Sequence, residues 1–144
     1  MNDKTSRPVG VIILFILILF QALSGIAGGI GLVFDPSGDS VGIPVTWLEG
    51  SPFSDYLVPG LILLFVLGVF PLVVSFGLLK KMRYSWLGSL LIAFGLIIWI
   101  GVEILIIGYQ AKPPLQLIYG SLGFILLILT LLPSVRNYYR VQHK

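Results

Sequence analysis

The apolar residues of this chain are gathered into four long blocks, each with at most one Asp, Glu, Lys or Arg. The blocks cover Val9–Phe34, Tyr56–Leu79, Tyr84–Gly108 and Leu115–Leu132. A helix rises about 1.5 Å per residue, so about 20 residues cross the hydrocarbon core of a bilayer. The blocks do not alternate with period two, and lipid requires backbone groups to be satisfied within each segment. Each block is therefore predicted to be a transmembrane helix, the shorter fourth one crossing nearly upright or extending by a turn.

Composition agrees with a membrane protein. Hydrophobic residues make up 57% of the 144 residues and charged residues 10%, against about 45–50% and about 25% in soluble domains. A soluble domain of this size needs a more polar exterior, because so much of its chain lies at the surface. These values exclude ordinary soluble enzymes and disordered tails, and the absence of Cys excludes disulfide scaffolds.

The basic residues predict an orientation. Eight of the nine lie before the first block, between the second and third, or after the fourth. With four spans these segments share one face, which the positive-inside tendency places in the cytoplasm together with both termini. The predicted fold is all-α: an integral membrane up-down four-helix bundle, with 134–144 as a cytoplasmic tail. The cations are sparse and juxtamembrane, so no nucleic-acid partner is expected.

The connection 35–55 is long and is predicted to be extracytoplasmic. It begins with turn-forming residues and then mixes acidic groups with apolar and aromatic side chains. We expect it either to fold back over the outer helix ends or to lie in the membrane interface, anchored by Trp47. It is a candidate functional surface, although it also fits a cover for the bundle. Its candidate contact residues are Asp35, Asp39, Trp47 and Glu49.

Glu103 is the only acid inside a block and lies about 7 Å below the predicted outer end. An acidic side chain at the bilayer centre costs about 2.5–3.5 kcal/mol, and less near the edge. Two interpretations stay open: a proton- or cation-responsive carboxyl at a substrate site, or a structural hydrogen bond. Polar residues expected at a similar depth make up a candidate outward-facing pocket: Glu103, Gln110, Gln116, Tyr119 and Asp55.

Other features concern helix packing. Gln21 lies in the middle of the first block, where an amide usually bridges helices by a hydrogen bond. Pro71 lies inside the second block, so a kink is expected and the carbonyl of Leu67 lacks its helical donor. Small residues at four-residue spacing predict close helix contacts, either within this bundle or in a homodimer: Ser24, Gly25, Gly28 and Gly29.

Missing residue types narrow the chemistry. The chain has no Cys, and its one His is His143 in the predicted tail, so thiolate sites and a membrane Ser-His-Asp triad are excluded. No phosphate-binding or dinucleotide-binding glycine motif is present. The segment from Asp35 to Thr46 lacks the Gly and the Glu of a calcium-binding EF-hand loop. No metal site and no cofactor are predicted.

The loop also supports a resemblance. Asp35-Pro-Ser-Gly, Gly42-x-Pro44 and Ser51-Pro-Phe-Ser-Asp-Tyr-Leu-Val-Pro-Gly60 resemble a pattern in uncharacterised small bacterial four-span membrane proteins. The chain is also similar to DoxX-like proteins in size and topology only. Small multidrug transporters are likewise short four-span proteins, but their essential Glu lies in the first span, where this chain has Gln21. The resemblance implies the four-span fold and, together with the compact size, a bacterial plasma membrane. It assigns no catalytic residue.

Three functions follow as hypotheses. The favoured one is a non-enzymatic accessory or binding subunit whose outer loop and polar rim contact a partner or lipid. The second is a small proton- or cation-linked transporter that uses Glu103. The third is a membrane enzyme that uses Asp55 and Glu103 as an acid–base pair on a lipid-like substrate. The expected partners are the lipid bilayer and, as open alternatives, another protein or a second copy of the chain.

Overall fold

The computed structural model describes residues 7–109 and 114–141, and the regular structure within these ranges is helical. The long elements are α1 (Val9–Phe34), α2 (Leu57–Leu64), η4 (Phe65–Val69), α3 (Phe70–Leu79), α4 (Tyr84–Ile107), α5 (Leu115–Leu131) and α6 (Pro133–Val141). The four apolar blocks are therefore helical, with ends within one residue of those predicted. The all-α prediction is confirmed.

Three of the described segments are long and apolar enough to cross a membrane: Val9–Phe34, Leu57–Leu79 and Tyr84–Ile107. The fourth apolar block gives the 17-residue helix α5, which reaches the necessary length only together with α6. That pair is bent by 59° at its break. The described chain thus has three such segments, or four if the bent pair is one span, which indicates a membrane protein.

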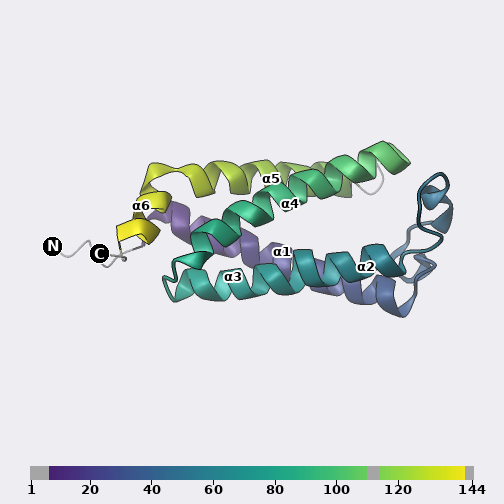
Figure 1. The fold of residues 1–144 in the computed structure, drawn as a ribbon, viewed down its shortest axis with the longest axis horizontal. Helices are drawn as coiled ribbons and strands as arrows, with labels where there is room; N and C mark the ends of the chain where they lie inside the picture. Colours follow the sequence, from purple (N-terminus) through teal and green to yellow (C-terminus); the bar gives the residue numbers. More distant parts are fainter. Residues whose placement is uncertain (1–6, 110–113, 142–144) are drawn as a thin grey trace.

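The long helices run roughly along the long axis of the molecule in Figure 1, with α4 crossing obliquely, whereas the short α6 turns away from it. Helix α1 contacts α2, η4 and α3, while α3 contacts α4 and α4 contacts α5. Buried apolar side chains from several of these helices fill the space between them: Val11, Leu14, Ile18, Leu67, Val74, Leu78, Ile92, Leu96, Leu122 and Leu126. Many large apolar side chains face outward, and Leu105 is 87% exposed. Such a surface suits lipid better than water.

Residues 133–141 form a helix, where a polar tail was predicted. Pro133 begins α6, a position at which the missing N–H of proline costs nothing. Val135 and Tyr139 lie four residues apart on one face, and both are buried. The Tyr139 hydroxyl donates a hydrogen bond to the Leu78 carbonyl at 3.1 Å. Periodic apolar residues hidden in a short charged sequence thus dock α6 against the end of α3.

Charged residues divide between the two ends of the molecule. In Figure 1 the start of α1, the α3–α4 turn and α6 share one end, and the α1–α2 connection lies at the other. The first end holds the basic residues Arg7, Lys80, Lys81, Arg83, Arg136 and Arg140. Arg7 Nη2 also donates to the Leu79 carbonyl there, at 2.8 Å. The connection holds four acids and no basic residue.

The connection 35–56 folds back onto the ends of α1 and α2, the first of the two arrangements predicted for it. It contains the short turns η2 (Asp39–Val41) and η3 (Val45–Leu48), which contact α1 and α4 respectively. Tyr56 ties the segment together: its N–H donates to the Pro36 carbonyl and its hydroxyl to the Pro44 carbonyl, both at 2.8 Å. A small second core of Leu32, Leu48 and Tyr56 lies beneath it.

The second apolar block contains a π-helical segment, η4, directly before Pro71. A wide turn of this kind is one known way for a helix to accommodate a local interruption. A side chain added at Gly25 would overlap the Leu67 carbonyl, and one added at Gly29 would lie 2.6 Å from the Leu64 backbone. These glycines of α1 are therefore used in close packing within the chain.

Candidate functional site

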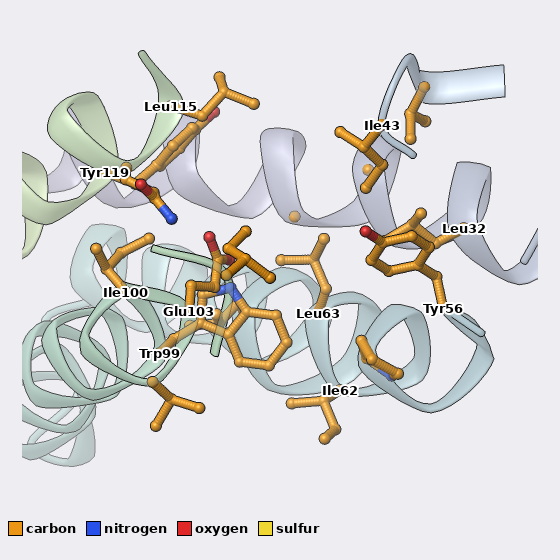
Figure 2. Close-up of a pocket in the computed structure, with 18 of the residues that line it drawn as sticks. Leu32, Ile43, Tyr56, Ile62, Leu63, Trp99, Ile100, Glu103, Leu115 and Tyr119 are labelled. Carbon is orange, nitrogen blue, oxygen red and sulfur yellow. The ribbon is translucent and has the colours of Figure 1, made fainter. Parts of the chain in front are cut away.

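A cavity of about 320 Å³ lies between α1, α2, α4 and α5, with the 35–56 segment contributing to its wall. Figure 2 shows its lining, in which the apolar side chains Leu32, Ile43, Leu63 and Ile100 outnumber the polar ones. Cavities that bind small molecules are typically about 300–1,000 Å³, mostly apolar, with a few placed polar groups. This cavity has the size and lining of such a site.

The polar side chains of the cavity gather around Glu103 of α4. In Figure 2, Glu103, Trp99 and Tyr119 lie together at one part of the cavity, and Leu32, Ile43 and Tyr56 lie at another. Glu103 is half-buried, and its carboxyl has the side chains of Gln116 and Trp99 as hydrogen-bonding neighbours. The cavity therefore has one polar region and one apolar region.

Gln116 fixes the first turn of α5 against the end of α4. It is buried, and its Nε2 donates to the Gly108 carbonyl at 3.2 Å. Gly108 ends α4 with φ of 74° and ψ of 173°, a positive-φ conformation that glycine adopts without steric cost. Tyr119, one helical turn further along α5, stacks its ring on Phe20 of α1 with centroids 6.1 Å apart. These two contacts hold the first turns of α5 in place beside the carboxyl of Glu103.

The structure brings three of the predicted pocket residues together in the cavity wall: Glu103, Gln116 and Tyr119. Asp55 does not line the cavity, since its Oδ1 instead accepts the N–H of Leu57, the first residue of α2, at 3.0 Å. That contact satisfies an N-terminal helix donor that would otherwise lack a partner. Gln110 lies outside the described residues.

Among the predicted loop residues, Trp47 lines the cavity, whereas Asp35, Asp39 and Glu49 do not. The Asp35 carboxylate instead shapes the start of the loop: it accepts the Ser37 hydroxyl at 2.6 Å and the Ser40 N–H at 3.0 Å. These hydrogen bonds favour the ionised form and lower the pKa of Asp35 below its usual value. Asp35 is therefore a structural residue of the loop.

Gln21 also lines the cavity, which the sequence did not indicate. Its side chain is 2% exposed, and its Nε2 donates to the Leu67 carbonyl at 2.9 Å. Its Oε1 has no hydrogen-bond partner among the described residues. The amide assignment follows from the network, because exchanging the two atoms would place two oxygens against each other. The cavity wall therefore includes a buried, unpaired acceptor.

Aromatic side chains from three parts of the chain meet at the cavity. Trp99 precedes Glu103 by four residues, so helical spacing alone places both on one face. The further aromatic lining residues come from the loop and from α5: Trp47, Phe53, Tyr56 and Tyr119. No local spacing predicts that the loop aromatics share a cavity with Glu103, because the folding of the loop brings them to the cavity wall.

The charge of the cavity wall has one sign. Of the described residues that line it, Glu103 is the only acid, and none is Lys, Arg or His. Within residues 7–109 and 114–141, no group of three or more His, Cys, Asp or Glu side chains is placed to hold a metal ion. The wall thus combines one carboxyl with aromatic and aliphatic side chains, an arrangement suited to binding a small apolar or amphipathic molecule.

Comparison with known proteins does not assign the chain to a family. No protein-family model matches the chain, and no match was found among curated proteins or among solved structures. The resemblance to small four-span membrane proteins stays a prediction. Function is therefore argued from the cavity.

Proposed function

We propose that this chain is an integral membrane protein that binds a small, mainly apolar molecule in the cavity beside Glu103. The observation that supports this function is the cavity of about 320 Å³, whose wall is apolar apart from a few polar side chains. Binding to such a wall is favourable because it removes apolar surface of the ligand from water, and the polar groups of the wall orient the ligand. Binding of this kind fits the favoured hypothesis of a non-enzymatic accessory or binding subunit.

We further propose that the helices form an up-down four-helix bundle in a bacterial plasma membrane, with α6 in the cytoplasm. The support is the division of charge, with basic residues at the α6 end and acids in the 35–56 segment. Because the chain has no Cys, single cysteines can report the orientation. Exposed Ser54 and Asn137, each changed to Cys, should react with an impermeant thiol reagent from the outside and from the cytoplasm respectively. Reaction of both from one side would contradict the orientation.

Ligand binding can be read from tryptophan fluorescence. Trp47 and Trp99 line the cavity, whereas Trp86 donates its ring N–H to the Thr130 carbonyl at 2.8 Å and does not line it. Bromobenzene, a small apolar quencher, should quench the fluorescence of the purified protein in two parts. One part saturates at the cavity, and the other rises linearly as the probe partitions into detergent.

A matched pair of glycine variants tests whether the saturable part comes from the cavity. Gly28 lines the cavity, and a side chain there first meets the flexible end of Leu63 at 3.2 Å. Gly101 has open space around it and does not line the cavity. Gly28→Leu should abolish the saturable quenching, while Gly101→Leu should retain it. No saturable quenching in the wild type, or equal quenching in both variants, would refute the proposed function.

Glu103 in the cavity wall also supports a second candidate function, a proton- or cation-linked transporter. A transporter would move its ligand across the membrane, whereas a binding subunit would only hold it. In proteoliposomes, transport predicts ligand uptake that depends on a pH gradient and is lost in Glu103→Gln. Saturable binding without uptake would leave the binding function alone. The hypothesis of an enzyme with an Asp55–Glu103 pair gains no support, because Asp55 does not line the cavity.

A further inference from the structure

The chemistry of the cavity wall bears on which class of molecule it binds. Among the described lining residues, Glu103 is the only one that offers an acidic group, its carboxyl. None of the described lining residues supplies a compensating Lys, Arg or His. A carboxylate in a water-poor space is costly unless an opposite charge accompanies it, and the attraction between the two is strong there.

Aromatic rings supply a second interaction that favours a positively charged ligand. Trp99 lies one helical turn from Glu103 and next to it in Figure 2, with Tyr119 at the same part of the cavity. Trp47, Phe53 and Tyr56 line the cavity from the loop, with Tyr56 at the part away from Glu103. The negative faces of aromatic rings attract cations, and this attraction strengthens when the cation is removed from water. Carboxyl and rings together favour a positive charge over a neutral group.

The loop that contributes to the cavity wall favours the same charge. The 35–56 segment, which contributes to the cavity wall, contains Asp35, Asp39, Glu49 and Asp55 and no basic residue. A surface of one sign raises the local concentration of oppositely charged ligands and speeds their association. The rest of the wall is aliphatic and large enough for an apolar body.

We propose that the ligand of this cavity is a lipophilic cation, an apolar body with one positively charged nitrogen, held with that nitrogen beside Glu103. This inference rests on the proposed function, since it assigns the chemical class of the molecule bound in the same cavity. The carboxyl and the rings hold the charge, and the aliphatic part of the wall holds the body.

A pair of isosteric probes tests the charge alone. Phenethyltrimethylammonium and 3,3-dimethylbutylbenzene have nearly the same shape and differ in having nitrogen or carbon at the branched centre. Binding of each to the purified wild-type protein is measured by saturable tryptophan quenching or by calorimetry, with partition into empty micelles subtracted. The wild type should bind the cation at least about tenfold more tightly than the neutral isostere.

Two matched variants locate the source of the preference. Glu103→Gln keeps the size of the side chain and removes its charge, so the preference for the cation should fall at least about threefold, to the part that the aromatic rings supply. Glu49→Gln makes the same change at an exposed acid that does not line the cavity, and it should keep most of the preference. If Glu103→Gln fails to fold, the wild-type comparison still decides the proposal, because it needs no variant.

The outcomes separate this inference from the proposed function. If the wild type binds the neutral isostere as tightly as the cation, the cation proposal is wrong and the binding function stands. If the preference for the cation is undiminished in Glu103→Gln, the assignment to Glu103 is wrong. If neither the two isosteres nor bromobenzene shows saturable binding to the wild type, the binding function fails and the cation proposal fails with it.

Discussion

The side chain of Gln21 in α1 donates a hydrogen bond from Nε2 to the backbone carbonyl of Leu67 in η4, at 2.9 Å. That carbonyl is the one whose α-helical donor is missing, because residue 71, four positions later, is proline. Both groups are buried, so each would be costly to leave without a partner. A side chain thus compensates, across 46 residues of sequence, for a backbone donor that proline removes.

The Gln21–Leu67 hydrogen bond predicts coupling between Gln21 and Pro71. Gln21→Leu should lower the free energy of unfolding by about 1 kcal/mol, because the loss of a hydrogen bond outweighs removal of the unpaired Oε1. In a Pro71→Ala background the backbone N–H of Ala can donate to Leu67, so Gln21→Leu should cost less. The unfolding free energies of the wild type, the two single variants and the double variant are measured by denaturant titration in mixed micelles. Their comparison gives the coupling. Additive effects would contradict it.

Close packing of α1 against η4 predicts opposite effects of two Gly→Ala substitutions. A methyl group at Gly25 would overlap the Leu67 carbonyl, whereas one at Gly101 meets nothing within 4 Å. Gly25→Ala should therefore destabilise the protein by about 1–3 kcal/mol, as overpacking does. Gly101→Ala should be neutral or stabilising by about 0.5–1 kcal/mol, because alanine favours a helix interior. Thermal unfolding in detergent compares them, and equal effects would show that Gly25 has no special packing role.

The docking of α6 predicts a role for one tyrosine hydroxyl. Tyr139→Phe removes the donor to the Leu78 carbonyl while keeping the buried ring, so it should cost about 0.5–1.5 kcal/mol. Tyr138→Phe is the control, because the Tyr138 ring lies under the Lys81 amine at 4.4 Å and keeps its aromatic face. Unfolding free energies and protease sensitivity of α6 measure both. A larger effect at Tyr138 would contradict the predicted anchor.

The hydrogen bonds of Asp35 predict that acid opens the loop. Because they hold the folded-state pKa of Asp35 below its usual value, the carboxylate stabilises the loop at any pH above the unfolded-state pKa, which is about 3.9. That stabilisation is lost as the pH falls through the folded-state pKa. Trp47 fluorescence should therefore change below about pH 4 in the wild type.

A pair of loop variants checks this assignment. Asp35→Asn should remove the acid-dependent change in Trp47 fluorescence, because an amide has no carboxylate to protonate. Asp39→Asn, at the next acid along the loop, should retain it. The fluorescence is recorded with Trp86 and Trp99 changed to Phe, so that only the loop tryptophan reports. An unchanged titration in Asp35→Asn would assign the transition to another group.

Part of the candidate site was predictable from local spacing. Trp99 and Glu103 share a helix face because they lie four residues apart, and Gln116 and Tyr119 share one because they lie three apart. The hydrogen bond of Gln21 to another helix was also predictable, since a buried amide in lipid needs a partner. The cavity itself was not, because its walls come from segments far apart in the chain whose meeting depends on loop folding.

The helix α6 is an element that hydropathy alone did not predict. Its sequence is charged, so it was predicted to be a polar tail, yet Val135 and Tyr139 are buried against the bundle. Apolar and aromatic residues recur at Val135, Tyr138 and Tyr139, but nine residues are too short a segment for that spacing to identify a helix. The residues that cover Val135 and Tyr139 come from distant parts of the chain, because α6 contacts α1 and α4 as well as α5.

By itself the sequence determined that the chain is helical and where each long helix begins and ends. The physical reason is local: an unbroken apolar block in lipid can satisfy its backbone only within its own segment. The tertiary structure decided that Gln21 faces the cavity, that Asp55 does not line it and that the loop covers α1 and α2. These facts depend on which helix faces meet, and side chains of similar hydropathy on all sides of a helix do not specify that choice.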